Sequence, residues 1–381
     1  MSNEPAGSKH RKISTRLEIE IAAGKYTAGT RLPSELQLVK QFGVSRPTVA
    51  RALRDLEIKG LIERRAGSGT YVRSGQTQQT TATRVLGLLV PGLSTTEIFH
   101  IICGEIASLA RVHDYGLLWG GSTSPLLDED ASLKHAEEIC SQFIERKISG
   151  VFFAPAELQP KQEEANFRLA ESLREAGITV VLIDRDITPF PRRSDFDLVG
   201  IDNLAAGYMI AEHLIKLGCR KILFVSRPLS AATVNARIAG VREALVQNGL
   251  EQDSNWVRQG DPRDVKFVRS LVSGKLADAI ICANDDTAAV LARTLESRGI
   301  KLPHDVRVAG FDDVKYAMLV SVPLTTIHQP CRDIAHVAFQ TMLRRLAEPT
   351  LPVQSISLTP SLVVRESCGA YLQSPRPGRS Q

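Results

Sequence analysis

Polar side chains follow three apolar segments of this chain, each at the point where a predicted strand ends. Asp184 and Arg185 follow Val-Val-Leu-Ile, and Asn284 follows Ile-Ile-Cys-Ala. Asp312 follows Val-Ala-Gly-Phe in the same way. Ligands of open α/β sheets bind beyond the carboxyl ends of the strands, so the pattern predicts one polar cleft. Carboxylate, amide and guanidinium groups suit a sugar, whose hydroxyls both donate and accept hydrogen bonds. The alternative at each position is that Asp or Asn caps the following helix.

A different chemistry is predicted between residues 45 and 58, where arginines share one face of a helix. Ser45 is a suitable N-cap, and Pro47 suits the first turn because no intrahelical N–H is needed there. The apolar positions recur at helical spacing and predict the buried face; they are Val49, Ala52, Leu53 and Leu56. The residues left free of the core are Arg46, Pro47, Thr48, Ala50, Arg51 and Arg54.

Two further elements are needed to position this arginine-bearing helix. Ser34 and Gln37 form a capping-box pattern that predicts a short helix ending at Phe42, and Gly43 allows a tight turn. Two helices joined by such a turn predict a helix-turn-helix whose second helix enters the major groove. Residues 61–65 and 70–73 read as two strands around a glycine-rich tip at residues 66–69, which predicts a wing.

Residues 11–73 resemble the winged helix-turn-helix domain of the GntR family of transcription regulators. The resemblance rests on the motifs Arg-Leu-Pro-Ser-Glu, Gly-Val-Ser-Arg-Pro-Thr-Val, Leu-Glu-x-Lys-Gly-Leu-Ile and Arg-Arg-x-Gly-Ser-Gly-Thr-Tyr-Val. The family often has arginine where this chain has Leu36 and Ala50, so we expect a different base preference. The residues that we expect to contact double-stranded operator DNA are Ser34, Arg46, Pro47, Thr48, Arg51, Arg54, Arg65, Gly67, Ser68 and Gly69.

The charge of the chain is concentrated in this first segment. The whole chain of 381 residues has a formal net charge of +5. Residues 1–73 hold 14 Lys and Arg against 7 Asp and Glu, whereas the remainder holds 33 against 35. A cationic head on a nearly neutral body is typical of proteins that bind nucleic acid.

Several other classes of site lack a sequence signal. The six cysteines include no CxxC pair and the eight histidines form no HxxxH or HExxH motif, so we expect buried free thiols and no metal. We find no nucleophile and base pair and no cofactor motif, so we expect neither a catalytic residue nor a cofactor. Without a membrane-length apolar run or the apolar core of a signal peptide, we expect a cytoplasmic location and no membrane partner.

The rest of the chain alternates apolar strands with amphipathic helices. Residues 74–83 are polar or small and predict a flexible linker between separately folded domains. Beyond them, near-continuous apolar strands indicate parallel sheets covered on both faces, so the fold class is α/β. Nearly 300 residues exceed one ordinary core, which favours two lobes. The predicted strands lie near 85–90, 116–119, 150–153, 180–183, 221–225, 279–282 and 306–309, and helices near 98–112, 131–146 and 167–176.

Residues 84–368 resemble the effector domain of LacI-type repressors, which is similar to periplasmic sugar-binding proteins. The resemblance rests on Ala283-Asn284-Asp285, Val308-Ala309-Gly310-Phe311-Asp312-Asp313, Pro323-Leu324-Thr325-Thr326-Ile327-His328-Gln329-Pro330 and further segments in the same order. It implies a homodimer, and two lobes at about 84–195 with 329–352 and about 196–328 with 353–368, followed by a tail at 369–381. It also implies effector contacts from Thr95, Phe99, Asp184, Arg185, Thr233, Arg237, Asn284, Asp312 and Gln329.

Together the two resemblances imply a repressor that a small sugar releases from its operator, like the arabinose-repressor subgroup of the GntR family. An enzyme is the competing class, because some GntR-type heads are joined to pyridoxal-phosphate enzymes. That class needs a Schiff-base lysine, and none of the candidates Lys216, Lys221, Lys275, Lys301 and Lys315 lies in a supporting motif. A secreted sugar-binding protein is the third possibility, against which the winged head argues.

Overall fold

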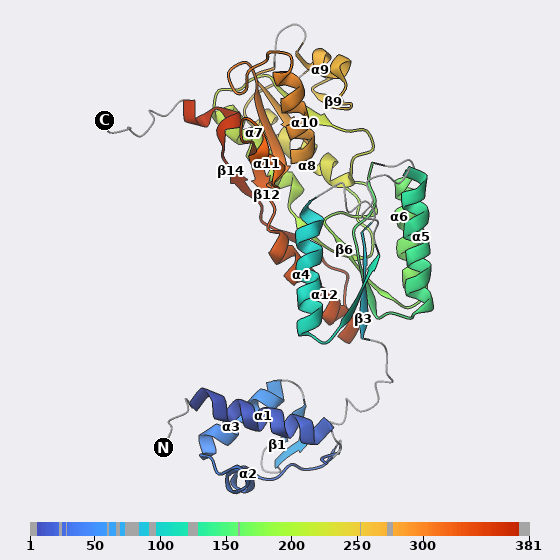
Figure 1. Ribbon diagram of the computed structural model, residues 1–381, viewed down its shortest axis with the longest axis vertical. Helices are drawn as coiled ribbons and strands as arrows, with labels where there is room; N and C mark the ends of the chain where they lie inside the picture. The colour runs from blue at the N-terminus through green and yellow to red at the C-terminus, as the bar shows by residue number, and fades with distance from the viewer. Residues whose placement is uncertain are drawn as a thin grey trace, which may run out of the picture. The chain divides into compact units, whose positions relative to one another are not determined.

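The chain divides into two compact units, Met1–Thr81 and Ala82–Gln381, each with its own apolar core (Figure 1). The computed structural model describes residues 6–22, 25–27, 29–58, 61–65, 69–72, 84–90, 97–120, 129–158, 161–251, 253–272 and 277–372. The predicted linker at 74–83 lies outside the described residues.

The first unit packs three helices against a two-stranded hairpin, which confirms the predicted winged helix. The elements are α1 (Ala6–Ala22), α2 (Glu35–Phe42), α3 (Arg46–Ile58), β1 (Ile62–Arg65) and β2 (Gly69–Val72). The hairpin is antiparallel with Ile62 opposite Val72. Residues 29–32 add backbone hydrogen bonds to β2. The helix α1, which packs on α3, is an addition to the elements that the sequence predicted.

The predicted local signals act as expected in α2 and α3. The Ser34 hydroxyl accepts a hydrogen bond from the Gln37 N–H, and the Gln37 side chain accepts one from the Ser34 N–H at 2.8 Å. Gly43 ends α2 with a φ of 61°, a left-handed conformation that favours glycine. Val49 and Leu53 on the apolar face of α3 are at most 1% exposed. The apolar face of α3 therefore packs in the core of the first unit, and its arginine face is exposed to solvent.

The first lobe of the second unit is a six-stranded parallel sheet between two helix layers. Alternate strand residues point to opposite layers. Phe152 and Val181 pack with α4 and α12, whereas Phe153 and Leu182 pack with α5 and α6. Figure 1 shows these two pairs of helices on opposite faces of the sheet. In sheet order the strands are β13 (Ser355–Leu358), β7 (Asp197–Ile201), β6 (Thr179–Ile183), β5 (Gly150–Phe153), β3 (Val85–Leu89) and β4 (Gly116–Gly120). The helices are α4 (Ile98–Val112), α5 (Glu129–Glu145), α6 (Gln162–Glu175) and α12 (Cys331–Ala347).

The second lobe repeats this plan with one antiparallel edge strand. Phe224 and Ile281 pack with α7 and α8, whereas Val225 and Ile280 pack with α9 and α10. In sheet order the strands are β14 (Ser361–Val363), β12 (Thr325–His328), β11 (Arg307–Asp312), β10 (Ala279–Cys282), β8 (Ile222–Ser226) and β9 (Val257–Gln259), and β14 alone among them pairs antiparallel. The helices are α7 (Asn203–Lys216), α8 (Ala232–Gln247), α9 (Val265–Val272), α10 (Asp285–Glu296) and α11 (Tyr316–Leu319).

Helices α7 and α8 touch through their backbones at two glycines. A Cβ atom on Gly207 would lie 2.0 Å from the Arg237 carbonyl oxygen, and one on Gly240 would lie 1.9 Å from the Leu204 carbonyl oxygen. No side chain fits at either position. This close approach fixes the part of α8 that carries Arg237.

The sheets correct two predicted lobe boundaries. Strand β7 was predicted to begin the second lobe, but it lies between β6 and β13 in the first. Strand β13 likewise belongs to the first lobe, so the chain crosses after Ile201, His328 and Leu358. Every β7 residue is buried, and Asp197 forms an ion pair with Arg345, in the last turn of α12, at 2.8 Å. Burial and this ion pair hold the strand in the first lobe. Within the predicted tail at 369–381, Ala370–Leu372 forms a 3-10 turn, and residues 373–381 lie outside the described residues.

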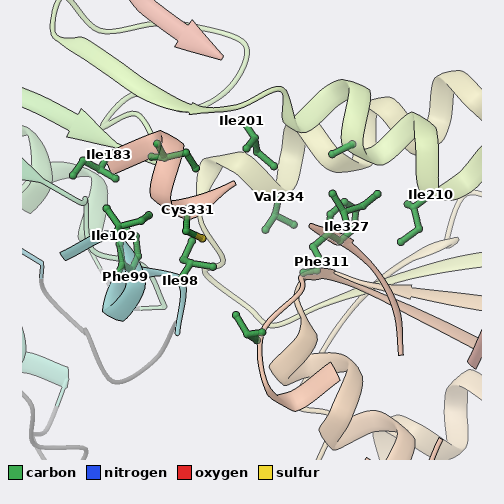
Figure 2. Close-up of a cluster of buried hydrophobic side chains, with 14 of the residues drawn as sticks. Ile98, Phe99, Ile102, Ile183, Ile201, Ile210, Val234, Phe311, Ile327 and Cys331 are labelled. Carbon is green, nitrogen blue, oxygen red and sulfur yellow. The ribbon is translucent and has the colours of Figure 1, made fainter. Parts of the chain in front are cut away.

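One apolar cluster runs from the first lobe into the second. It includes Ile98, Phe99 and Ile183 on one side and Val234 and Phe311 on the other (Figure 2). The lobes therefore share buried surface next to the ends of β6 and β11, where the predicted polar residues lie.

Candidate ligand cleft and DNA interface

A small cavity lies between the two lobes of the second unit, beyond the carboxyl ends of β6, β10 and β11. Its volume is about 20 Å³, which is room for roughly one water molecule. The predicted effector residues that line it are Asp184, Arg185, Thr233, Arg237, Asn284, Asp312 and Gln329. The structure thus brings together, from both lobes, side chains up to 145 positions apart in the numbering.

Arg237, in the second turn of α8, is fixed by three partners. Its Nε donates to Asn203 Oδ1 at 2.8 Å, and its Nη1 donates to the Ala283 carbonyl oxygen at 2.6 Å. Its Nη2 lies 3.5 Å from Asp312 Oδ1. The Arg237 and Asp312 side chains are 5% and 6% exposed, so this ion pair is buried. A guanidinium held in this way lines the cavity in one fixed orientation.

Asp312 ends β11 in a strained backbone conformation, with a φ of 107°. Such conformations persist where surrounding contacts hold them, and they cluster at binding sites. The Gln329 amide donates to Asp312 Oδ1 at 2.7 Å. Burial raises the pKa of Asp312 to about 6, although Arg237 and Gln329 act in the opposite direction.

Arg185 is the charged centre of the first-lobe side of the cavity. Its Nε lies 3.1 Å from Asp184 Oδ2, and its Nη1 lies 2.8 Å from Glu157 Oε1. Burial lowers the pKa of Arg185, but the two carboxylates outweigh burial and raise it. The Phe99 ring lies 5.2 Å from this guanidinium and does not line the cavity. The Phe99 ring packs against Arg185, and a contact between Phe99 and the effector stays a prediction.

Two buried oxygen atoms of the cavity have no hydrogen-bond partner among the described residues. They are Asp184 Oδ1 and Gln329 Oε1, on side chains that line the cavity. An unsatisfied buried acceptor costs about 1–3 kcal/mol. A ligand that supplies two donors, such as two hydroxyl groups, would remove both costs.

The strand-end rule found some cavity residues and missed others. Asn284 accepts a hydrogen bond from the Thr287 N–H, so its oxygen caps α10 while the residue also lines the cavity. Glu157 and Arg227 line the cavity and were not predicted. They follow β5 and β8, so the same rule applied to those two strands could have found them. Thr95 lies outside the described residues.

Direct contacts hold the lobes together around the cavity. The Ala231 N–H at the start of α8 donates to Glu157 Oε2 at 3.0 Å. The Leu158 N–H donates to the Leu229 carbonyl oxygen at 2.8 Å. Lys315 forms an ion pair with Glu97. A ligand larger than a water molecule can enter only if these contacts or the side chains between them move.

Asp312 gives the stability of the second unit a characteristic pH dependence. Its folded-state pKa of about 6 exceeds the ordinary value of 3.8. The contribution of protonated Asp312 to the free energy of unfolding is therefore complete below pH 3.8 and is lost as pH rises through 6. Burial, and after it the charge of Asp312, raises the pKa of Asp285. We compare the free energy of unfolding of the parent with that of Asp312→Asn. The parent value minus the variant value should fall by about 1–3 kcal/mol between pH 4.5 and pH 7.5. Urea titrations at several pH values measure this, with the exposed Asp253→Asn as control. A difference that is flat with pH would show that Asp312 titrates normally.

The recognition helix presents its arginines as predicted. Pro47, Arg51 and Arg54 are exposed, and Arg46 is 70% exposed and forms an ion pair with Glu35 at 3.1 Å. The Thr48 hydroxyl bonds to that of Ser45 at 2.8 Å. Ser34 is exposed at the start of α2, where its hydroxyl serves the capping box. Side chains at the start of α2 and on the first two turns of α3 thus face solvent.

The predicted wing residues are described in part. Gly69 begins β2 with a φ of 123°, and a Cβ there would lie 2.5 Å from Arg31 Nε. Glycine is therefore required where the strand leaves the wing tip. Gly67, Ser68 and the side chain of Arg65 lie outside the described residues.

Other kinds of site have no counterpart in the part of the chain that the structure describes. No group of three or more His, Cys, Asp or Glu side chains there could hold a metal ion. All six cysteines are free and buried, as predicted. None of the helices in the described ranges is both long and apolar enough to cross a membrane.

Comparison with known proteins separates the same two parts of the chain. Residues 9–72 match the gntR family of bacterial regulatory proteins, and residues 211–368 match the periplasmic binding protein-like domain. The arabinose metabolism transcriptional repressor of Geobacillus stearothermophilus is 24% identical over 368 residues, which is 94% of this chain and 97% of that protein. The ribose operon repressor of Escherichia coli (strain K12) is 31% identical over 193 residues, 50% of this chain and 58% of that protein. The solved structure of the transcriptional regulator CelR-cellobiose complex has a TM-score of 0.64 at 21% identity, and the match covers 85% of this chain and 91% of that one.

A winged helix with exposed recognition arginines, joined to a two-lobed domain with a polar cleft, defines a DNA-binding transcriptional regulator. Within that class, this chain combines a GntR-type winged helix-turn-helix domain with a periplasmic-binding-protein-like effector domain of the LacI type.

Proposed function

We propose that the protein is a cytoplasmic, homodimeric repressor that leaves its operator when a small sugar binds in the cleft between the lobes. The observation that carries this proposal is the pair of unpartnered buried oxygens, Asp184 Oδ1 and Gln329 Oε1. Both are acceptors, and a sugar supplies hydroxyl donors to both at once. We also propose the domain bounds predicted from the sequence: the DNA-binding head at 1–73, the linker at 74–83 and the effector domain from residue 84.

The names of similar proteins agree with a sugar effector, since they mention arabinose, ribose and cellobiose. The proposal assigns no catalytic role. A pyridoxal-phosphate enzyme needs a lysine that forms a Schiff base, and none of the described residues that line the cavity is a lysine.

The proposed release mechanism depends on the contacts between the lobes. A cavity of about 20 Å³ is too small for a sugar, so binding must favour a different arrangement of the lobes or of their cleft side chains. A ligand shifts such an equilibrium only through its different affinity for the two arrangements. In a dimer, the altered lobes change the spacing of the two winged heads, which must match two half-sites of the operator. Operator and sugar then weaken each other's binding by the same factor.

The test uses the full-length protein and a duplex selected from random DNA by that protein. A thermal-shift screen of monosaccharides and disaccharides identifies binders, because a ligand that binds the native state raises its Tm. Fluorescence anisotropy then measures duplex affinity with each binder present. We expect a typical coupling of 5- to 150-fold weaker DNA binding, roughly 1–3 kcal/mol. If a sugar binds and DNA affinity does not change, the proposed release mechanism is wrong.

A further inference from the structure

Arg227 is a cavity arginine whose guanidinium has no partner among the described residues. It follows β8, is half-buried, and lines the same cavity as Asp184 and Gln329. The other two arginines there are already engaged, since Arg185 pairs with two carboxylates and Arg237 pairs with Asp312. Arg227 can therefore donate to a ligand without breaking an existing ion pair.

The start of α8 lies beside Arg227 and favours negative charge. This helix has 16 residues, and its N-cap Ala231 provides no side-chain cap. The first N–H groups of a helix carry a partial positive charge and bind anionic oxygens. The Ser230 hydroxyl donates to the Arg227 carbonyl oxygen at 2.7 Å, which fixes the loop between Arg227 and the helix. Thr233, in the first turn of α8, also lines the cavity.

A carboxylate of the chain already occupies this position. Glu157 Oε2 accepts the Ala231 N–H at 3.0 Å while Glu157 Oε1 pairs with Arg185 at 2.8 Å. Glu157 belongs to the first lobe and Ala231 to the second, so this bond is also one of the contacts between the lobes. An anion that takes the place of Glu157 at α8 would break that contact.

We propose that the effector is an anionic sugar derivative, either a sugar phosphate or a sugar acid. This inference rests on the proposed function. Its hydroxyls donate to Asp184 Oδ1 and Gln329 Oε1, which are on side chains 5% and 1% exposed. Its anionic group accepts hydrogen bonds from Arg227 and from the start of α8, where it displaces Glu157. Release of Glu157 links binding of the anion directly to the arrangement of the lobes.

Matched pairs of ligands and two variants with opposite expected effects test this proposal. The panel contains ribose, glucose and fructose, the 5- or 6-phosphate of each, gluconate, glucuronate and inorganic phosphate. Thermal shift and calorimetric titration of the full-length protein measure Kd. We expect a phosphate or an acid to bind about 10- to 100-fold more tightly than its neutral parent, as loss of a charge-assisted hydrogen bond implies. The phosphates and the acids together identify which anionic group the site accepts.

Arg227→Gln should weaken binding of that anionic ligand by about 10- to 100-fold and weaken binding of the neutral sugar much less. Glu157→Gln should strengthen it several-fold, because a competing carboxylate is removed. The exposed Arg298→Gln in the same lobe controls for loss of one positive charge. The Tm of each variant without ligand checks folding.

Each other outcome contradicts the proposal. If a neutral sugar binds as tightly as its phosphate and Arg227→Gln has no effect, the anionic site is wrong while the sugar-responsive function stands. If an anionic sugar binds equally well to Arg227→Gln and the parent, Arg227 is not its ligand. If nothing in the panel raises Tm although the protein still binds its selected duplex, both the anionic site and the sugar effector are wrong.

Discussion

Replacing Arg237 with alanine is expected to lower the free energy of unfolding of the effector domain by about 3–5 kcal/mol and to abolish the response to effector. Removing one partner of a buried ion pair has a cost of that size, since the other charge is left without compensation. Arg237 and Asp312 are 5% and 6% exposed. The change also leaves Asn203 Oδ1 and the Ala283 carbonyl oxygen without their donors.

The pH dependence of this loss identifies its cause. Arg237 lowers the pKa of Asp312, so the variant should hold that carboxyl protonated to a higher pH than the parent. A raised folded-state pKa means stability that is lost as pH rises, so the variant should lose more stability at pH 8 than at pH 5. Urea titration at both pH values measures the loss. Arg242→Ala, an exposed arginine on the same helix, should change stability by less than about 0.5 kcal/mol.

Operator binding separates a local effect from general unfolding in the same variant. At a temperature where the variant is folded, its winged head should retain affinity for the selected duplex, because the head has a separate core. A variant that binds the duplex and is released by the effector as readily as the parent would show that Arg237 is not an effector residue.

The sequence predicted which residues line the cavity where a residue's position follows from the end of its own strand. Asp184, Asn284 and Asp312 all reach the cavity, because the carboxyl ends of parallel strands meet at one edge of a sheet. The capping alternative also holds at Asn284, which caps α10 and lines the cavity. The sequence did not reveal how the charges pair, because the pairs Arg185–Glu157 and Arg237–Asp312 depend on side-chain distances within each folded lobe and not on spacing along the chain.

The prediction was less successful where the choice depends on packing between distant segments. An apolar strand such as β7 fits either sheet, and its place in the first lobe is set by β6, β13 and the Arg345 ion pair. Phe99 is next to a cavity residue in sequence, Ile98, but its ring points to Arg185 and the apolar cluster. One position along a helix turns a side chain by 100°, so proximity in sequence alone could not assign Phe99 to the cavity.

Replacing Arg46 with alanine is expected to weaken binding to the selected operator by about 10- to 100-fold, or 1–3 kcal/mol, and to relax base discrimination at one position. The side chain is 70% exposed on the first turn of α3, where the recognition helix of this class reads base edges. Its pairing with Glu35 does not oppose this role, because an exposed ion pair contributes only about 0–1 kcal/mol. Arg46 can therefore exchange the carboxylate for a guanine or a phosphate.

The measurement must distinguish base recognition by Arg46 from simple loss of positive charge. Affinities for the selected duplex and for a scrambled duplex are measured over a range of salt concentrations, with Arg16→Ala as the matched control. Arg16 is on α1, is 64% exposed, and pairs with Glu20, so its removal costs the head the same charge away from the recognition helix. If Arg46 reads a base, Arg46→Ala lowers affinity for the selected duplex more than for the scrambled one. Loss of a phosphate contact would instead lower both affinities by the same factor. Equal losses on both duplexes would assign Arg46 to the phosphate backbone, and unchanged affinity for the selected duplex would remove it from the DNA interface.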